Sequence, residues 1–198
     1  MKKHASRTSL QPNFIVVGIG GSAGGLAAYM ALFDALPSNT GMAFVVVSHI
    51  LPTASSQLAQ ILSRHTKMPV EIASMSLPIK PNHVYVSPPN VDLRIENYSF
   101  KVVSPRTRGN VQVDIFFNSL AAAIGERAIG VILSGYFGDG TEGCRQIKAQ
   151  GGITFAQDNS AEVEGMPLSA QASGCIDFVL PPDKIAKELR RLGSVKKK

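Results

Sequence analysis

Three nearly continuous apolar runs constrain the fold of this chain more than any other feature of its sequence. They cover residues 14–18, 43–49 and 128–134 and are rich in valine and isoleucine. Each run is followed by a turn and then by a segment with the residue pattern of a helix. A strand that is apolar at successive positions is buried on both faces of its sheet. The pattern therefore predicts an α/β fold, in which a doubly wound, mostly parallel sheet carries helices on both faces.

The rest of the chain continues this alternation with one exception. Residues 83–87, 91–95 and 100–103 alternate apolar and polar side chains between short turns. This alternation predicts short antiparallel strands that form a hairpin at one edge of the sheet. Further strands of the main sheet are expected at residues 152–157 and 175–180. Helices are expected at residues 26–36, 54–64, 113–124, 141–150, 167–173 and 183–192.

Length and charge distribution indicate one domain with two polar ends. A chain of 198 residues has the size of about one domain, and no linker interrupts this one. The expected organisation is a polar arm over residues 1–12, a single domain over residues 13–192 and a basic tail over residues 193–198. The net charge is +6, but half of the 20 basic residues lie in the arm and at residues 184–198, without interleaved aromatic residues. We therefore expect no nucleic-acid partner.

Targeting and metal-binding signals are missing from the sequence. No apolar run approaches the roughly 18 residues of a membrane-spanning helix, so no membrane insertion is expected. The N-terminal residues lack the apolar centre of a signal peptide. The two cysteines, Cys144 and Cys175, are too few for a disulfide framework and lack the spacing of a zinc site. These features predict a cytoplasmic protein without a bound metal.

Polar side chains with complementary chemistry follow the three apolar runs. In an open parallel sheet, ligands bind beyond the carboxyl ends of the strands, so the residues just after each strand are candidates for a site. Ser22 follows the first run, His49 ends the second, and Asp139 lies in the glycine-rich turn after the third. A serine, a histidine and an aspartate that meet at one edge of a sheet are the components of a nucleophilic triad.

Local patterns leave other interpretations open. Residues 20–24 match the G-x-S-x-G turn, which exposes a serine hydroxyl before a helix whose free amides would favour an oxyanion. Residues 18–23 also fit a dinucleotide-binding fingerprint, but that site needs an acidic residue where His49 stands. Taken singly, Ser22 could cap the following helix, His49 could be a structural histidine, and Asp139 could serve only its turn.

Five motifs along the chain are Val17–Leu26, Val47–Pro52, His83–Asn90, Gly130–Gly140 and Gly165–Pro167. With these motifs in this order, the chain resembles the catalytic domain of the chemotaxis receptor methylesterases, which are also receptor glutamine deamidases. The resemblance covers about residues 13–192. It implies a serine hydrolase that removes methanol from glutamate γ-methyl esters on chemoreceptors, with glutamine deamidation as a second activity.

The resemblance also implies roles for individual residues. Ser22 would be the nucleophile, His49 the general base and Asp139 the carboxylate that orients the histidine. The backbone amides of Ala23 and Tyr136 would hold the oxyanion. The candidate residues of the substrate cleft are Gly21, Phe137, Glu162, Glu164 and Met166. No cofactor is implied, and the partners would be the cytoplasmic helices of methylated chemoreceptors and a methyltransferase, fused or separate.

The sequence departs from the usual pattern of this family. Ala23 stands where familiar members often have threonine. The third loop, often Gly-Met-Gly-Asn-Asp-Gly, reads Gly-Tyr-Phe-Gly-Asp-Gly at residues 135–140, so Tyr136 and Phe137 would reshape the mouth of the site. Because only about a dozen residues precede the first strand, we expect no phosphoacceptor receiver domain in this chain. A catalytically idle interaction module, a nucleotide-binding enzyme and a hydrolase of small esters remain alternatives.

Overall fold

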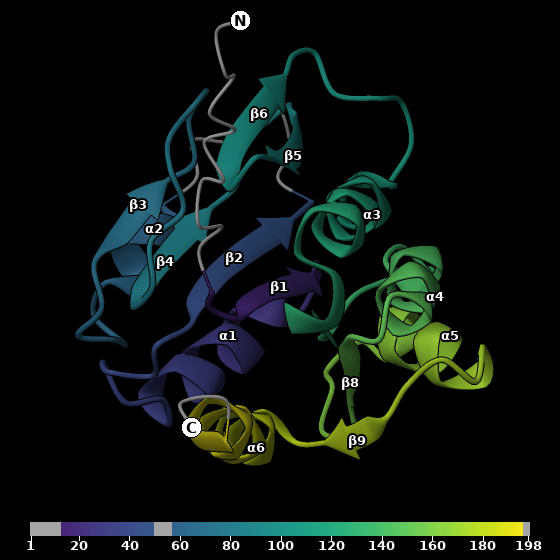
Figure 1. Ribbon diagram of the computed structural model, residues 1–198. Helices are drawn as coiled ribbons and strands as arrows, with labels where there is room; N and C mark the ends of the chain where they lie inside the picture. Colours follow the sequence, from purple (N-terminus) through teal and green to yellow (C-terminus); the bar gives the residue numbers. More distant parts are fainter. Residues whose placement is uncertain (1–12, 50–56, 196–198) are drawn as a thin grey trace, which may run out of the picture.

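The computed structural model describes residues 13–49 and 57–195. In this part of the chain, seven parallel strands form one sheet in the order β3-β4-β2-β1-β7-β8-β9, and β5 and β6 form a second, antiparallel sheet (Figure 1). The strands are β1 (Val16–Gly21), β2 (Ala43–Ser48), β3 (Val70–Ile72), β4 (His83–Val86), β5 (Asp92–Glu96), β6 (Ser99–Val103), β7 (Ala128–Ile132), β8 (Ile153–Gln157) and β9 (Phe178–Leu180). The helices are α1 (Gly25–Asp34), α2 (Leu58–Leu62), α3 (Gln112–Ile124), the 3₁₀ turn η1 (Gly125–Arg127), α4 (Thr141–Ala149), α5 (Gly165–Ala172) and α6 (Pro182–Val195).

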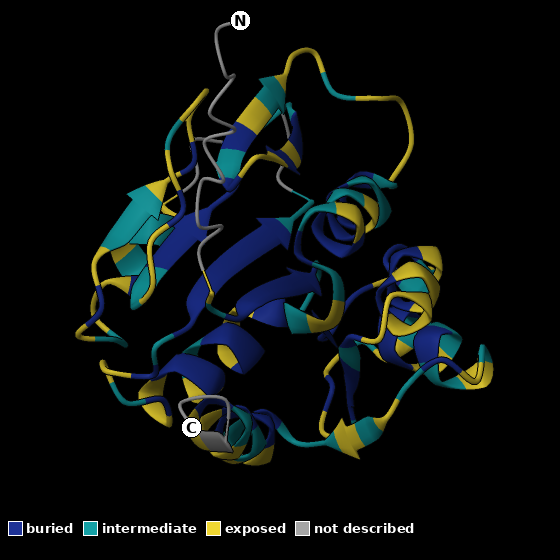
Figure 2. Cartoon of the chain, viewed as in Figure 1, coloured by how far each residue is buried: buried dark blue, intermediate teal, exposed yellow. Residues whose placement is uncertain are grey.

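Helices cover both faces of the large sheet. Successive side chains of a strand point to opposite faces, and here apolar side chains on both faces are covered. In β2, Ala43, Val45 and Val47 belong to a core shared with α3, α4 and α5, whereas Phe44 and Val46 belong to a core shared with α1, α2 and α6. Figure 1 shows α3, α4 and α5 on one side of the sheet and α1 and α6 on the other. The central strands between them are buried (Figure 2). This arrangement confirms the predicted doubly wound α/β fold.

The strands between residues 83 and 103 pair differently from the expectation. β4 joins the main sheet, where it lies parallel between β2 and β3, and only β5 and β6 form the antiparallel hairpin. The hairpin is a separate sheet, and its apolar side chains pack in the same core as α3. The alternating pattern led to the wrong pairing for β4, because the Tyr85 side chain is buried in the core instead of facing solvent. Its hydroxyl accepts a hydrogen bond from the Lys80 N–H at 3.0 Å, so the polar atom has a partner inside the fold.

The other element boundaries lie within a few residues of those predicted. α5 begins earlier than expected, at Gly165, and α6 extends to Val195. The helix predicted at residues 54–64 is described only in part, and there α2 spans Leu58–Leu62. β3 had not been predicted, because three residues are too short to show a period. The arm at residues 1–12 and the last three residues of the tail lie outside the described residues.

Gly18 allows α3 to pack directly on β1. A Cβ atom at Gly18 would lie 2.7 Å from Cε1 of Phe117 and 3.0 Å from Cδ2 of Leu120, both on α3. We expect Gly18→Ala to lower the free energy of unfolding by about 1–3 kcal/mol, because the added methyl group overpacks this contact. Urea denaturation measures the loss. Replacement of the exposed Ala27 by serine is the control, expected to stay within about 0.5 kcal/mol of the parent chain. Equal stability of Gly18→Ala and the parent chain would contradict this account of the packing.

Candidate active site

The carboxyl ends of three strands meet at one edge of the large sheet. β1 lies between β2 and β7 and runs parallel to both. From β1 the chain continues into α1 on one face of the sheet, and from β7 it continues into α4 on the other face. The border between β1 and β7 is therefore a topological switch point, where open α/β sheets bind their ligands.

The structure joins His49 and Asp139, which are 90 residues apart in the sequence. His49 follows β2, and its Nε2 lies 2.6 Å from Oδ2 of Asp139 in the turn after β7. Both side chains are almost completely withdrawn from solvent, with exposed fractions of 7% and 1%. A hydrogen bond of this length between buried groups fixes the orientation of the imidazole ring. The ring nitrogen that faces the carboxylate is therefore Nε2.

The N-terminus of α3 holds the carboxylate of Asp139 from the other side. The backbone N–H of Val113 donates to Oδ2 and the N–H of Asp114 donates to Oδ1, both at 2.9 Å. Amides in the first turn of a helix have no partner within that helix, and the positive end of the helix dipole favours an anion there. Asp139 therefore has partners for both oxygens and forms a rigid support for His49.

The second ring nitrogen of His49 remains available. Nδ1 is buried and has no hydrogen-bond partner within the described residues. Gly21 of β1 pairs with Ser48 of β2, and Ser22 and His49 are the next residues after this pair. No hydrogen bond connects the Ser22 hydroxyl to His49 in the part of the chain that the structure describes. The structure thus brings His49 and Asp139 together and places Ser22 at the neighbouring strand end.

Backbone hydrogen bonds hold the turn that carries Ser22, and its hydroxyl bonds to none of the described residues. The N–H of Ser22 donates to the carbonyl of Ser134 at 2.8 Å, and the N–H of Gly25 donates to the carbonyl of Ser22 at 3.0 Å. Gly24 precedes α1 with a φ of 70°, and no side chain caps this helix. The interpretation of Ser22 as a helix cap is therefore wrong.

Two backbone amides near Ser22 are candidates for oxyanion donors. The N–H groups of Ala23 and Tyr136 form no hydrogen bond with any of the described residues. The backbone of Gly135 passes close to Ser22, since a Cβ atom at Gly135 would lie 3.1 Å from Cβ of Ser22. Amides that have no partner among the described residues and lie beside a candidate nucleophile are suited to stabilise negative charge on a bound carbonyl oxygen.

The residues expected in the substrate cleft divide into exposed and buried groups. The exposed ones are Phe137, Glu162 and Glu164. The expectation that Met166 lines the cleft is wrong, because its side chain is completely buried against Gly135. Gly21 is buried as well, and the hydroxyl of Tyr29 occupies the space that a side chain at Gly21 would need. Met166 and Gly21 therefore support the turns of the site from within.

Ser134 joins three segments of the site, although the sequence did not single it out. Its Oγ donates to the carbonyl of Ala23 at 2.8 Å and accepts from the N–H of Val163 at 2.9 Å. Its own N–H donates to Oε1 of Gln157 at 3.0 Å. Ser134 therefore ties the turn of the candidate nucleophile to the loop before α5. Its place at the end of an apolar run was the only signal in the sequence.

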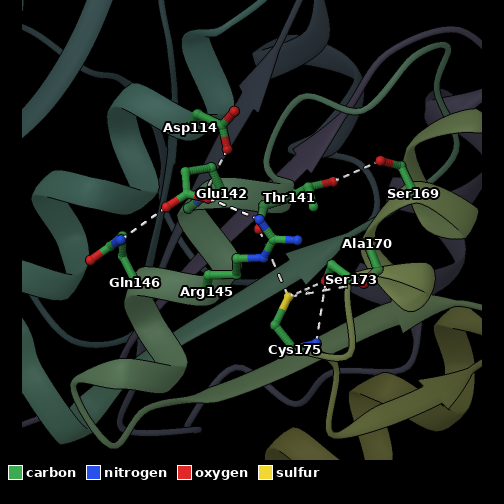
Figure 3. Close-up of polar contacts among 10 residues, drawn as sticks. Asp114, Thr141, Glu142, Arg145, Gln146, Ser169, Ala170, Ser173 and Cys175 are labelled. Atoms are coloured by element: carbon green, nitrogen blue, oxygen red, sulfur yellow. Dashed lines mark hydrogen bonds and ion pairs between the residues drawn. The ribbon is translucent and has the colours of Figure 1, made fainter.

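Asp114 links the site to α4. Its Oδ1 accepts a hydrogen bond from the N–H of Gly143 at 2.7 Å, and Figure 3 shows the carboxyl group directed at the first turn of α4. Desolvation by burial raises the pKa of Asp114 from 3.8 to about 6. The charges of Asp139 and Glu142 also raise this pKa, and the bond from Gly143 opposes them. The carboxyl groups of Asp139 and Asp114 thus connect α3 and α4 at the site.

Metal-binding clusters and membrane-spanning helices are both absent from the described residues. Within residues 13–49 and 57–195, no three or more His, Cys, Asp or Glu side chains are grouped to hold a metal ion. In the same part of the chain, no helix combines the length and apolar character needed to cross a bilayer. Cys144 and Cys175 are both buried and form no disulfide.

One family of known proteins matches almost the whole chain. The family model described as CheB methylesterase matches residues 17–189. The chain belongs to the CheB methylesterase family. The crystal structure of the Thermotoga maritima CheB methylesterase catalytic domain matches it with a TM-score of 0.85 and 32% sequence identity, over 91% of this chain and 100% of that one. These findings confirm the resemblance and the fold expected from it.

Relatives within the CheB family differ in length. A chain from Leptospira interrogans, with the provisional name protein-glutamate methylesterase/protein-glutamine glutaminase, is 34% identical over 184 residues, which are 91% of this chain and 95% of the relative. The protein-glutamate methylesterase/protein-glutamine glutaminase 2 of Burkholderia lata is 35% identical over 181 residues, which are 88% of this chain but 52% of the relative. This chain therefore spans nearly all of one relative and about half of the other.

The raised pKa of Asp114 predicts a contribution to stability that depends on pH. Between about pH 4 and pH 6, the folded chain keeps a proton on Asp114 that the unfolded chain has released, so this carboxyl destabilises the fold as the pH rises. In Asp114→Asn, the amide oxygen can still accept the bond from Gly143 but cannot ionise near Asp139 and Glu142. The stability of the variant relative to the parent chain should therefore increase as the pH rises from 4.5 to 7.5. Urea unfolding at both pH values measures this change.

A surface carboxyl provides the matched control for this measurement. Glu96 lies on β5 with an exposed side chain, and Glu96→Gln should show no comparable gain with pH. The prediction would be contradicted if Asp114→Asn and the parent chain differed in stability by the same amount at pH 4.5 and at pH 7.5.

Proposed function

We propose that this chain hydrolyses glutamate γ-methyl esters on methylated chemoreceptors and releases methanol. The 2.6 Å contact between His49 Nε2 and Asp139 carries the proposal, because it leaves Nδ1 of His49 as a base at the strand end next to Ser22. Membership in the CheB methylesterase family supports it, since relatives are named for this reaction.

In the first half of the reaction, Ser22 is the nucleophile and His49 is the general base. Asp139 accepts the hydrogen bond of the Nε2 proton, which favours the tautomer whose unprotonated Nδ1 can take the proton of the serine hydroxyl. The Ser22 oxygen attacks the ester carbonyl carbon, and the carbonyl oxygen becomes negatively charged. The amides of Ala23 and Tyr136 stabilise this charge, and one such donor contributes about 3–4 kcal/mol in comparable enzymes.

In the second half, the bond to the methoxy oxygen breaks and protonated His49 donates its proton, so methanol leaves. Water then attacks the acyl-enzyme while His49 accepts its proton, and Ser22 departs with that proton to regenerate the enzyme. The product is a glutamate carboxylate. The same steps on a glutamine side chain release ammonia, so we include the deamidation for which the relatives are also named.

The proposed substrate defines the partners and the compartment. The chain would act in the cytoplasm on the cytoplasmic helices of methylated receptors, with residues 13–192 as the catalytic domain. Formation of the ester requires a methyltransferase, whether it is fused to this chain or separate. The family match over residues 17–189 supports the assignment of the catalytic domain.

Replacing Ser22 removes the proposed nucleophile without removing a hydrogen bond of its side chain in the described part of the chain. We expect Ser22→Ala to reduce methanol release from methylated receptor membranes by at least about 10³-fold while the melting temperature stays unchanged. Ser194→Ala, at an exposed serine of α6, is the control and should keep full activity. A fluorophosphonate probe should label the parent chain and the control but not Ser22→Ala.

The outcomes of this experiment separate the alternatives. Methanol release that persists in Ser22→Ala would overturn the mechanism. A parent chain with neither labelling nor turnover would indicate a catalytically idle interaction module. Turnover of free esters without turnover of the methylated receptor would indicate a small-ester hydrolase.

A further inference from the structure

The loop between Gly135 and Asp139 exposes two aromatic side chains beside the candidate site. Phe137 is 75% exposed, more than any other large hydrophobic residue in the described part of the chain, and Tyr136 is 59% exposed. Their ring centroids lie 6.2 Å apart with an interplanar angle of 53°, so the rings do not stack on each other. Adjacent exposed aromatic side chains are typical of surfaces that contact a partner.

The backbone holds Phe137 in a strained conformation. Its φ is +66°, in the left-handed region that bulky side chains rarely adopt. Glycine, which has no side chain, would adopt the same conformation without strain. Strain of this kind persists only where the surrounding structure enforces it, and it is concentrated at functional sites.

Neighbouring segments enforce this conformation. The N–H of Gly135 donates to the carbonyl of Val163 at 2.9 Å, and the carbonyl of Gly135 accepts from the N–H of Met166 at 2.8 Å. Gly165 lies against the loop, since a Cβ atom there would be 2.8 Å from the backbone nitrogen of Phe137. The loop is thus fixed on the first turn of α5, and Phe137 is presented from a rigid support.

The position of the loop relates Phe137 to the proposed substrate. The same loop carries the amide of Tyr136, a candidate oxyanion donor, and ends at Asp139, which contacts His49. A glutamate methyl ester lies at the end of a short side chain, so a receptor helix must come close to Ser22 for the ester to react. Side chains three and four residues from the methylated glutamate lie on the same face of that helix as the glutamate. They would therefore lie over the loop between Gly135 and Asp139.

We propose that Phe137, together with Tyr136, determines substrate specificity by docking an apolar side chain three or four residues from the methylated glutamate on the receptor helix. This inference rests on the proposed function and assigns a substrate contact to the same site. The rigid aromatic rings supply apolar contact area with little loss of conformational entropy on binding.

Kinetics of Phe137→Ala test the proposal on two substrates. One is the methylated receptor in membranes, measured by methanol release, and the other is p-nitrophenyl acetate, a small ester without a helix. We expect the KM for the receptor to rise at least about tenfold while kcat changes less than about threefold. The loss of kcat/KM on the receptor should exceed the loss on the small ester by at least about tenfold.

Two further variants make the result specific. Ile72 on β3 is 55% exposed, and Ile72→Ala, the matched control at the edge of the sheet, should leave both activities unchanged. Phe137→Gly removes the ring and also relieves the left-handed strain, so its melting temperature should rise while the KM for the receptor still increases. A rise in KM together with higher stability cannot come from partial unfolding.

Four outcomes would overturn the inference. An unchanged receptor KM in Phe137→Ala would refute the inference, and so would equal losses of kcat/KM on the receptor and the small ester. In either case, Ser22-dependent methanol release by the parent chain would still uphold the proposed function. A parent chain that releases no methanol from the receptor would refute both. Conversion of a dimer to a monomer by Phe137→Ala, without a change in KM, would assign the loop to contact between two copies of the chain.

Discussion

Burial of the Asp139 carboxylate requires partners, and the candidate site is built from the partners that the fold provides. A buried carboxylate without hydrogen bonds would destabilise the fold by several kcal/mol, on the order of the penalty for an unpaired buried ion. The amides of Val113 and Asp114 and the ring of His49 supply its hydrogen bonds. These groups come from α3 and from the end of β2. The carboxylate is therefore satisfied only when α3, β2 and the turn after β7 have all reached their places.

Core packing and site geometry consequently depend on each other. α3 reaches Asp139 because β1 has glycines where α3 crosses it, and a side chain at Gly20 would collide with Val113. Asp114 ties the first turn of α4 to the same point through Gly143. A shift of α3 by about an ångström would thus disturb the support of His49, and displacements of that size reduce enzymatic rates strongly.

Short-range patterns in the sequence are sufficient to predict the central strands. His49 ends the second apolar run, and Ser22 and Asp139 lie in the turns after the first and third. Parallel strands bring such ends to one edge, so the candidate site follows from the pattern. Contacts between distant segments leave no comparable trace. Nothing around Ser134 indicates that it bonds two loops, and the place of β4 in the sheet depends on the burial of Tyr85. The identity of the nitrogen that faces Asp139 is likewise a result of the assembled fold.

The tautomer of His49 tests the central claim most directly. In the ¹⁵N-labelled chain, the imidazole NMR spectrum of neutral His49 should show the proton on Nε2 and none on Nδ1. In Asp139→Asn, the new amide can donate to Nε2, so the proton should move to Nδ1 and catalysis should fall by about 10⁴-fold, as expected for the wrong tautomer. A proton on Nδ1 in the parent chain, or a tautomer that does not respond to Asp139→Asn, would contradict the claim that Asp139 sets His49 as the base for Ser22.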